Sequence, residues 1–194
     1  TGLISGITTN PTLIFKSGKH PQTVYQELIK LGIDDISMEV MGDSEDELFK
    51  NAMGHVKSYA EKATIKLPCT IDGLKACKRL SAINVRTNVT LIFSPAQAIL
   101  ASLAGATYIS PFIGRMDDNS LDGMKLINDI SNTLRSDTKI LAASIRDPQS
   151  VGTAFALGAD ICTVPTDVFD RMYNHVLTDK GVEQFERDHA AASD

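Results

Sequence analysis

One lysine, Lys66, lies inside a short apolar run of the sequence, Ala-Thr-Ile-Lys-Leu-Pro at positions 63–68. Such a run is typical of a buried strand, and an ammonium group inside a buried strand is costly unless it is paired or neutral. Burial lowers the pKa of an amine, which is one way in which proteins obtain a nucleophilic amine at neutral pH. The alternative is a strand lysine whose long side chain reaches solvent from a sheet edge. The chemistry of the neighbouring strands must decide between these interpretations.

Polar side chains occupy one parity of several other short β-rich runs. Residues two apart on a strand share a face, and in a barrel one face lines the interior while the other packs against helices. Six runs place polar groups on the parity opposite their apolar residues; the residues that share this parity are Thr8 and Asn10, Ser37 and Glu39, Thr64 and Lys66, Asn88 and Thr90, Ser110 with Phe112, and Ser144 and Arg146. These residues gather toward the C-terminal ends of the runs, where barrels build their active sites. The alternative is an open sheet with one wetter face.

This set of residues suggests a reaction class. Attack of the Lys66 amine on a ketone would give a carbinolamine and then a Schiff base, whose cationic nitrogen is an electron sink for carbon–carbon cleavage. Glu39 could transfer protons, and the amides and hydroxyls suit a polyol. Arg115 and Arg146 follow the later strands, where barrels commonly bind phosphate, and an Arg fork donates two parallel hydrogen bonds to it. For each Arg alone, a surface ion pair is the alternative.

The elements that must position these residues alternate along the whole chain. Strands are expected near 4–9, 36–41, 63–68, 88–93, 107–113, 139–146 and 160–165, and helices near 21–31, 44–61, 72–82, 95–104, 120–135, 148–157, 167–175 and 180–192. A repeat of about 20 to 30 residues without a Gly-rich dinucleotide loop favours an α/β fold of the (β/α)8 TIM-barrel type over a doubly wound sheet. Seven strands are visible and the sequence opens at Thr1 without Met, so we expect the first strand to be missing from this sequence.

The composition limits the class of protein to which the sequence can belong. The 194 residues are 43% hydrophobic and 22% charged, which fits one barrel domain spanning residues 1–194. A net charge of −5 with mixed signs predicts no nucleic-acid partner, and no apolar run approaches membrane-spanning length. The three cysteines, Cys69, Cys77 and Cys162, lack CxxC spacing. They argue for a reducing cytoplasm and against zinc or a disulfide framework, and we expect no metal and no cofactor.

Six runs of residues resemble a known family in order and content. They are GITTNPTLI (6–14), IKLPCTIDGLKA (65–76), TNVTLIFSPAQA (87–98), AGATYISPFIGRMDD (104–118), LAASIR (141–146) and LTDKGVEQF (177–185). Over nearly its whole length the sequence resembles the transaldolase family, and its compact length and ending resemble the small branch that includes the fructose-6-phosphate aldolases. The resemblance implies a cytoplasmic enzyme of the pentose phosphate pathway. Such an enzyme moves dihydroxyacetone from fructose 6-phosphate or sedoheptulose 7-phosphate to an aldose phosphate, such as erythrose 4-phosphate, through a lysine Schiff base.

The same resemblance implies a role for each matched residue. Lys66 matches the Schiff-base lysine, and Glu39 matches the residue that works through a water held also by the match of Thr90. The hydroxyls of the dihydroxyacetone fragment are held at the positions of Asn10, Asn88 and Ser110, and the phosphate at those of Arg115, Ser144 and Arg146. The family's acid/base Asp ends its first strand, before Thr1, so no residue here is assigned that role.

Two positions separate the branches of the family. Glu39 and Phe112 resemble transaldolases, whereas fructose-6-phosphate aldolases have Gln and Tyr at the matching places. A Tyr hydroxyl would change how the catalytic water is held, while Phe leaves the bound fragment waiting for an aldehyde acceptor. A transaldolase is therefore predicted, and the alternatives are a fructose-6-phosphate aldolase and a non-catalytic phosphosugar-binding barrel.

The final helix, at about 180–192, has two possible roles. Val182, Phe185 and His189 stand at helical spacing and could cover the barrel mouth. In the small branch this helix packs on a neighbouring subunit of a ring, so the resemblance implies a homo-oligomer, a pentamer or a decamer.

Overall fold

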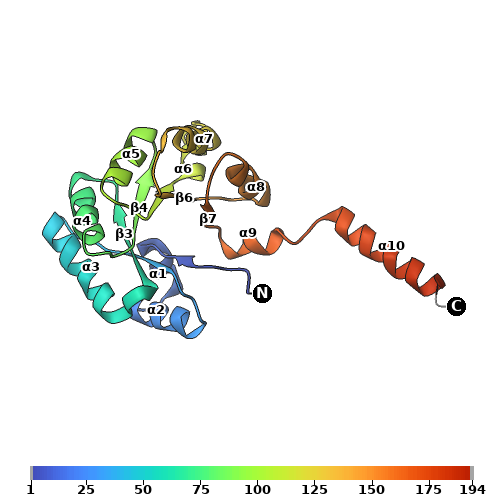
Figure 1. Cartoon of the computed structure of the whole chain (residues 1–194). Coiled ribbons are helices and arrows are strands. Elements are labelled where there is room, and N and C mark those ends of the chain that lie inside the picture. The colour runs from blue at the N-terminus through green and yellow to red at the C-terminus, as the bar shows by residue number, and fades with distance from the viewer. Residues whose placement is uncertain (1, 193–194) are drawn as a thin grey trace.

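The computed structural model describes residues 2–192 and contains one parallel sheet. Its strands follow chain order, and each pairs in parallel with the next. The sheet curls into a half-barrel with helices between its strands, as in a (β/α)8 TIM-like barrel, which confirms the predicted fold class (Figure 1). The strands are β1 (Ile7–Thr8), β2 (Ile36–Glu39), β3 (Ala63–Pro68), β4 (Thr87–Ile92), β5 (Tyr108–Pro111), β6 (Lys139–Ala142) and β7 (Ile161–Cys162).

The two edge strands of the sheet approach each other. The hydroxyl of Thr8, in β1, lies 2.7 Å from that of Thr163, which directly follows β7. No backbone pairing joins β1 to β7 within residues 2–192. The sheet is therefore curled far enough for side chains to meet across its open seam, and its inner face is an interior rather than an exposed surface.

Helices connect the strands and begin at side-chain caps. Ser44, Thr70, Ser94 and Asp147 each accept a hydrogen bond from the backbone N–H three residues later, which satisfies one of the free donors at a helix start. The helices are α1 (Pro11–Ser17), α2 (Pro21–Lys30), α3 (Glu45–Tyr59), α4 (Ile71–Ser81), α5 (Pro95–Leu103), α6 (Ile113–Asp117), α7 (Gly123–Thr133), α8 (Pro148–Ala156), α9 (Thr166–Arg171) and α10 (Val176–Ala192), with a 3-10 turn η1 (Ala60–Lys62).

The alternation of side chains along the strands is borne out by their burial. Ile65, Leu67 and Val89 are fully buried on the helix-facing parity, and the polar residues of the other parity are buried as well. Parallel sheets are covered on both faces, and here the second cover is the curled sheet itself. The alternative of a wetter, solvent-facing second face is therefore wrong for Thr64, Lys66, Asn88, Thr90 and Ser110, all of which are at most 4% exposed.

Several expected boundaries were wrong. β6 ends at Ala142 rather than 146 because Ser144 adopts a left-handed φ of 62°, which breaks the extended chain. β5 ends at Pro111 rather than 113 because Phe112 caps α6. β7 is likewise shorter than expected, and the short helices α1 and α6 had no prediction at all.

Helix α10 projects away from the barrel (Figure 1). None of its described residues is buried, and its apolar side chains are exposed, among them Leu177, Val182 and Phe185 at 68%, 51% and 74%. It therefore does not cover the barrel mouth, and this alternative for the final helix was wrong. Among residues 2–192, no helix is long and apolar enough to cross a membrane.

Candidate active site

Lys66 is buried in β3 beside a carboxylate. Glu39 and Lys66 are register partners on β2 and β3, so their side chains leave the sheet side by side. The Lys66 ammonium donates to Glu39 Oε2 at 2.9 Å and to the backbone oxygen of Thr9 at 3.1 Å. The two side chains are only 6% and 15% exposed. The lysine is thus a buried, hydrogen-bonded cation, and the expectation of a strand lysine that reaches solvent is wrong.

The backbone oxygen that accepts from Lys66 is held in place. Both the backbone N–H of Thr9 and its hydroxyl donate to the carbonyl oxygen of Ser37, at 3.0 and 2.8 Å. Behind Thr9 lies the ring of Tyr25 from α2, and burial raises the pKa of this phenol while a hydrogen bond to Thr9 lowers it. Thr9 is a contributor that the parity pattern did not single out, because it acts through its backbone, whereas Ser37 shares the inward parity of Glu39.

A second row of polar groups runs across β2, β4 and β5. Ser110 donates to Asn88 Oδ1 at 2.7 Å, and Asn88 Nδ2 donates to the Ser37 hydroxyl at 3.2 Å. Asn88 is also the register partner of Lys66. The chain therefore brings Glu39, Lys66, Asn88 and Ser110 together on the inner face, as the parity predicts.

Thr90, in β4, combines burial with an unsatisfied hydroxyl. It is 1% exposed, and its Oγ1 has no hydrogen-bond partner among the described residues. Directly after it, the pairing with β5 shifts at a β-bulge and Leu91 takes a φ of 60°. Bulges and strained backbone cluster at functional sites, and an orphaned buried hydroxyl is rare in a finished core. Thr90 is therefore a group that can receive a ligand or a water.

The predicted phosphate-binding residues form the rim. Ser144 is half-buried after β6, while Arg146 is exposed and pairs with Asp118 through both guanidinium Nη atoms. Arg115 lies on α6, with its guanidinium carbon 5.0 Å from the centre of the Phe112 ring. Both cations thus stand at the C-terminal side of β5 and β6, close to each other through Asp118.

Helix α6 is pressed onto this rim. A Cβ atom on Gly114 would lie 2.3 Å from the backbone oxygen of Ser144 and 2.9 Å from Arg146 Nε. The backbone N–H of Gly114 donates to that same oxygen at 3.2 Å. Only glycine permits this approach, so packing requires a glycine at position 114, while the charge is supplied by its neighbour Arg115.

The remaining predicted residues have structural contacts of their own. Asn10 caps α1, since its Oδ1 accepts from the backbone N–H of Leu13 at 2.8 Å, which leaves the donors of its amide nitrogen outside this contact. The Phe112 ring packs edge-on against Phe93, with 6.0 Å between ring centres. Asp118 is the neighbour of Arg146 that the sequence analysis did not single out, because no local pattern relates the two residues.

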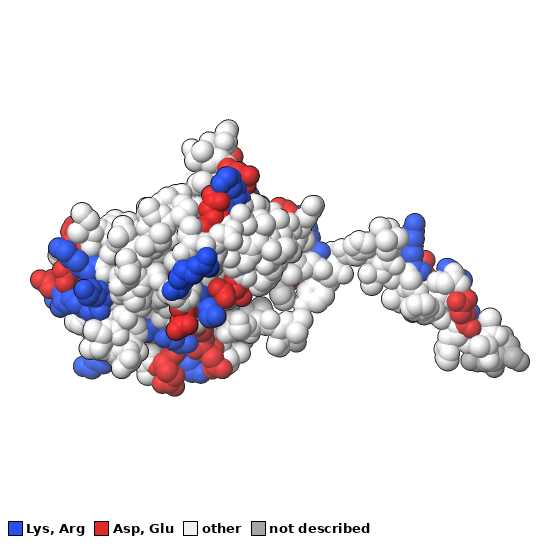
Figure 2. Space-filling view, turned by 45° about the horizontal axis from the view of Figure 1, so that its top comes forward, with Lys and Arg blue, Asp and Glu red and all other residues white. Residues whose placement is uncertain are grey.

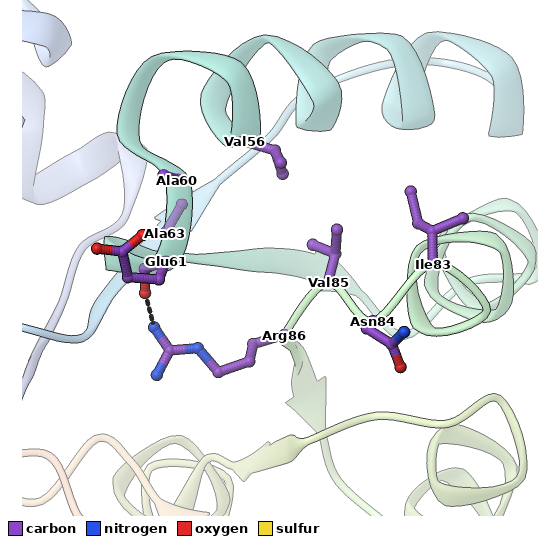
Figure 3. Close-up of a pocket in the computed structure, with 8 residues that line it drawn as sticks. All are labelled: Val56, Ala60, Glu61, Ala63, Ile83, Asn84, Val85 and Arg86. Atoms are coloured by element: carbon purple, nitrogen blue, oxygen red, sulfur yellow. Dashed lines mark hydrogen bonds between the residues drawn. The ribbon is translucent and has the colours of Figure 1, made fainter.

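The opposite end of the barrel has a different character. A cavity of about 460 Å³ lies there, beyond the start of β3, and apolar residues form most of its wall with Arg86 reaching across to the backbone oxygen of Glu61 (Figure 3). Next to it, the Asp35 carboxylate accepts from Thr64 at 2.7 Å and from Arg86 and Tyr108 at 2.9 Å each. This network is fully paired, so it reads as structural support.

The charge pattern adds no further site. On the face shown in Figure 2, basic and acidic side chains are interspersed rather than gathered in a patch of one sign. Within residues 2–192, no group of three or more His, Cys, Asp or Glu side chains is arranged to hold a metal ion. The free cysteines are buried or half-buried, and burial raises the pKa of Cys162 to about 11, which suits an inert thiol.

Comparison with known proteins gives a consistent result. A family model described as Transaldolase/Fructose-6-phosphate aldolase matches residues 1–194. Relatives described as "Probable transaldolase" include one from Caulobacter vibrioides, 48% identical over 98% of this chain and 89% of that protein. Others are from Symbiobacterium thermophilum, 46% identical over 98% and 89%, and from Nitrosopumilus maritimus, 44% identical over 96% and 86%.

Proposed function

Because the chain belongs to the transaldolase/fructose-6-phosphate aldolase family, we propose that it is a transaldolase that acts through a Schiff base at Lys66. The observation that carries this proposal is the buried Lys66 ammonium, bonded to Glu39 and bordered by the polar row of Asn88 and Ser110. The proposed substrates are ketose phosphates such as fructose 6-phosphate or sedoheptulose 7-phosphate and aldose phosphates such as erythrose 4-phosphate. No cofactor takes part in this chemistry.

The first half of the reaction uses Lys66 and Glu39. After loss of one ammonium proton to Glu39, Nζ attacks the C2 carbonyl and forms a carbinolamine. Glu39, with a water held at the Thr90 hydroxyl, returns a proton to the departing C2 oxygen, and water leaves to give the iminium ion. The C3–C4 bond then breaks, its electron pair moves toward the iminium nitrogen to give a neutral enamine, and the C4 hydroxyl gives its proton to water as the aldehyde forms. The acid/base Asp that the family uses for this proton has no counterpart assigned in residues 1–194.

The second half returns the fragment to an acceptor. The enamine carbon attacks the aldehyde of an aldose phosphate, the new alkoxide takes up a proton, and water hydrolyses the iminium to free Lys66. Asn10, Asn88 and Ser110 would hold the hydroxyls of the fragment through amide and hydroxyl hydrogen bonds. Arg115, Ser144 and Arg146 would hold the phosphate at the rim, where a guanidinium fork matches its oxygens.

A transferase is favoured over an aldolase by two side chains. The carboxylate of Glu39 and the ring of Phe112 match the transaldolase pattern, and Phe112 has no hydroxyl to place a second proton donor near the fragment. An assay with and without erythrose 4-phosphate separates the two activities. Release of free dihydroxyacetone from fructose 6-phosphate without an acceptor, at the rate seen with one, would favour the aldolase.

Borohydride trapping tests the central step. Incubation with fructose 6-phosphate and borohydride should attach the reduced fragment to the peptide that contains Lys66, as read by mass spectrometry. Lys66→Met should abolish the adduct. Lys139→Met is the matched control, since Lys139 is also a strand lysine beside a carboxylate, Asp160, but is 55% exposed. Bound substrate without an adduct at Lys66 would instead indicate a non-catalytic phosphosugar-binding barrel.

Assembly and location complete the proposal. We propose a cytoplasmic enzyme of the pentose phosphate pathway that forms a homo-oligomer, a pentamer or decamer, through the exposed apolar face of α10. Phe185→Asp should then reduce the mass measured by light scattering, because it puts a charge on the face that a second copy would bury. The same mass for both proteins would refute this role of α10.

A further inference from the structure

The guanidinium of Arg146 is held by a carboxylate of its own chain. Asp118 Oδ1 accepts from Arg146 Nη1 and Oδ2 from Nη2, so the pair is bidentate. Arg146 follows β6 and Asp118 follows α6, and the two side chains are 56% and 48% exposed. The planar fork of Arg donates in the same two parallel directions to a carboxylate and to a phosphate. Asp118 therefore occupies the donors that a substrate phosphate would use.

Asp118 also stands in the field of a second cation. The pKa of its carboxyl is lowered mainly by the hydrogen bonds from Arg146; burial opposes this, and the charges of Arg146 and Arg115 each lower the pKa by a smaller amount. The carboxylate thus lies where two arginines favour an anion. These are the same two arginines to which the proposed function assigns the phosphate.

Of the two adjacent aspartates, Asp118 forms the ion pair with Arg146, and Asp117 has a different partner. Asp117 Oδ1 accepts from the backbone N–H of Gly123 at 3.0 Å and so supports the start of α7. The Arg146 backbone is held separately, because its carbonyl oxygen accepts from Arg171 at 2.9 Å. The Arg146 side chain runs close past Gly114, since a Cβ atom there would lie 2.9 Å from Arg146 Nε. Release of Asp118 would make the two Nη donors of Arg146 available.

We propose that Asp118 is an intramolecular competitor for the substrate phosphate, exchanged for it on binding and returned to Arg146 on release. This inference rests on the proposed function and adds a residue that sets phosphate affinity. An exposed ion pair is weak, so the exchange hinders binding only modestly, and the waiting carboxylate favours departure of the phosphorylated product. The affinity of the site for phosphate is thereby kept below what the two arginines alone would give.

The test compares phosphate binding by five proteins, the wild type and four variants, at fixed ionic strength, with inorganic phosphate as the probe and calorimetry as the readout. Asp118→Asn keeps the shape of the side chain but removes its charge, and it should bind phosphate about two- to fivefold more tightly than the wild type. Asp129→Asn makes the same change of net charge in an exposed pair with Lys125 on α7, and it should bind like the wild type. Arg146→Ala should bind more weakly, and adding Asp118→Asn to it should restore little.

The same substitution has a kinetic signature. The KM for the phosphorylated acceptor should fall in Asp118→Asn by a factor similar to the gain in phosphate affinity. Phosphate binding that is unchanged or weaker in Asp118→Asn would overturn the proposal, since Asp118 would then only position Arg146. Equal binding by Arg146→Ala and the wild type would overturn it as well. Borohydride trapping at Lys66 is read separately, so a failure of the Schiff-base mechanism is distinguishable from a failure of this inference.

Discussion

Substitutions at the buried pair of Lys66 and Glu39 should have strongly non-additive effects on the free energy of unfolding. Glu39→Gln removes the charged partner of an ammonium whose side chain is 6% exposed. We expect a loss of about 3 kcal/mol in the free energy of unfolding, the lower end for a broken buried pair, because the carbonyl oxygen of Thr9 still accepts from Lys66. Lys66→Met leaves the Glu39 carboxylate, which is more exposed at 15%, and should cost about 2 kcal/mol.

The double variant distinguishes coupling from simple addition. With Lys66→Met and Glu39→Gln together, no uncompensated charge is left, and the protein should be only about 1–2 kcal/mol less stable than the wild type. The interaction energy of the cycle is then about 3–4 kcal/mol. Lys125→Met and Asp129→Asn form the control cycle, because that pair is exposed and joins successive helical turns, and its coupling should be about 0.5 kcal/mol.

Urea unfolding followed by circular dichroism measures all of these values, with the slope of the transition checked for constancy across variants. A double variant that loses as much stability as the two single variants together would refute the reasoning. It would show that Lys66 and Glu39 stabilise the barrel independently. A coupled pair that the double variant can replace at little cost is not required for the stability of the barrel, which agrees with the catalytic role proposed for it.

Three further outcomes follow from other contacts. Asp35→Asn should cost about 2–4 kcal/mol of stability in urea unfolding, because three donors lose one carboxylate, and an unchanged midpoint would contradict this. Gly114→Ala should weaken phosphate binding yet preserve trapping of unphosphorylated dihydroxyacetone at Lys66, because the added Cβ would press on the rim. The control is Gly54→Ala in α3, whose Cβ would meet no atom within 4 Å and which should add about 0.5–1 kcal/mol of stability. Burial lowers the pKa of His55 in the folded protein from 6.5, so the unfolded chain takes up a proton at this histidine at a higher pH than the folded protein does. The contribution of neutral His55 to the free energy of unfolding is therefore full above pH 6.5 and is lost as the pH falls from 6.5 toward the lower pKa of the folded state. The urea midpoint of the wild type should therefore be lower at pH 5.5 than at pH 8, and His55→Phe should remove the part of this difference that is due to His55. The same difference in the variant and in the wild type would argue against this role of His55.

The interior of the barrel could be predicted because the alternation of side chains along each strand can be read from the sequence and decides which side chains point into the barrel. Thr64 and Lys66 alternate with Ile65 and Leu67, and a parallel sheet buries both parities. Chain-order pairing of strands then places Glu39, Lys66 and Asn88 in adjacent register positions. The parity therefore predicts these contacts without knowledge of any distance.

The rim could not be predicted in the same way. Its backbone is set by tertiary contacts: Leu91 and Ser144 adopt positive φ although neither residue type favours it. Helix α6 has five residues, too few for a recognisable apolar period. The pairing of Asp118 with Arg146 joins two loops that no local pattern relates. The N-cap role of Asn10 is the exception, since an Asn before Pro is a helix-start signal that was present in the sequence.

The two ends of the barrel satisfy their polar groups differently. At the N-terminal end, the Asp35 carboxylate accepts from three donors and closes its network within the chain. At the C-terminal end, Thr90 is more deeply buried, at 1% exposed against 21% for the Asp35 side chain, but its hydroxyl finds no partner among the described residues, and the strained Leu91 adjoins it. A buried hydroxyl without a partner costs about 1–3 kcal/mol, which folding alone gives no reason to retain. The orphaned hydroxyl is explained when a water or a substrate supplies the missing hydrogen bond, which supports the proposal that the chemistry takes place at the C-terminal end of the strands.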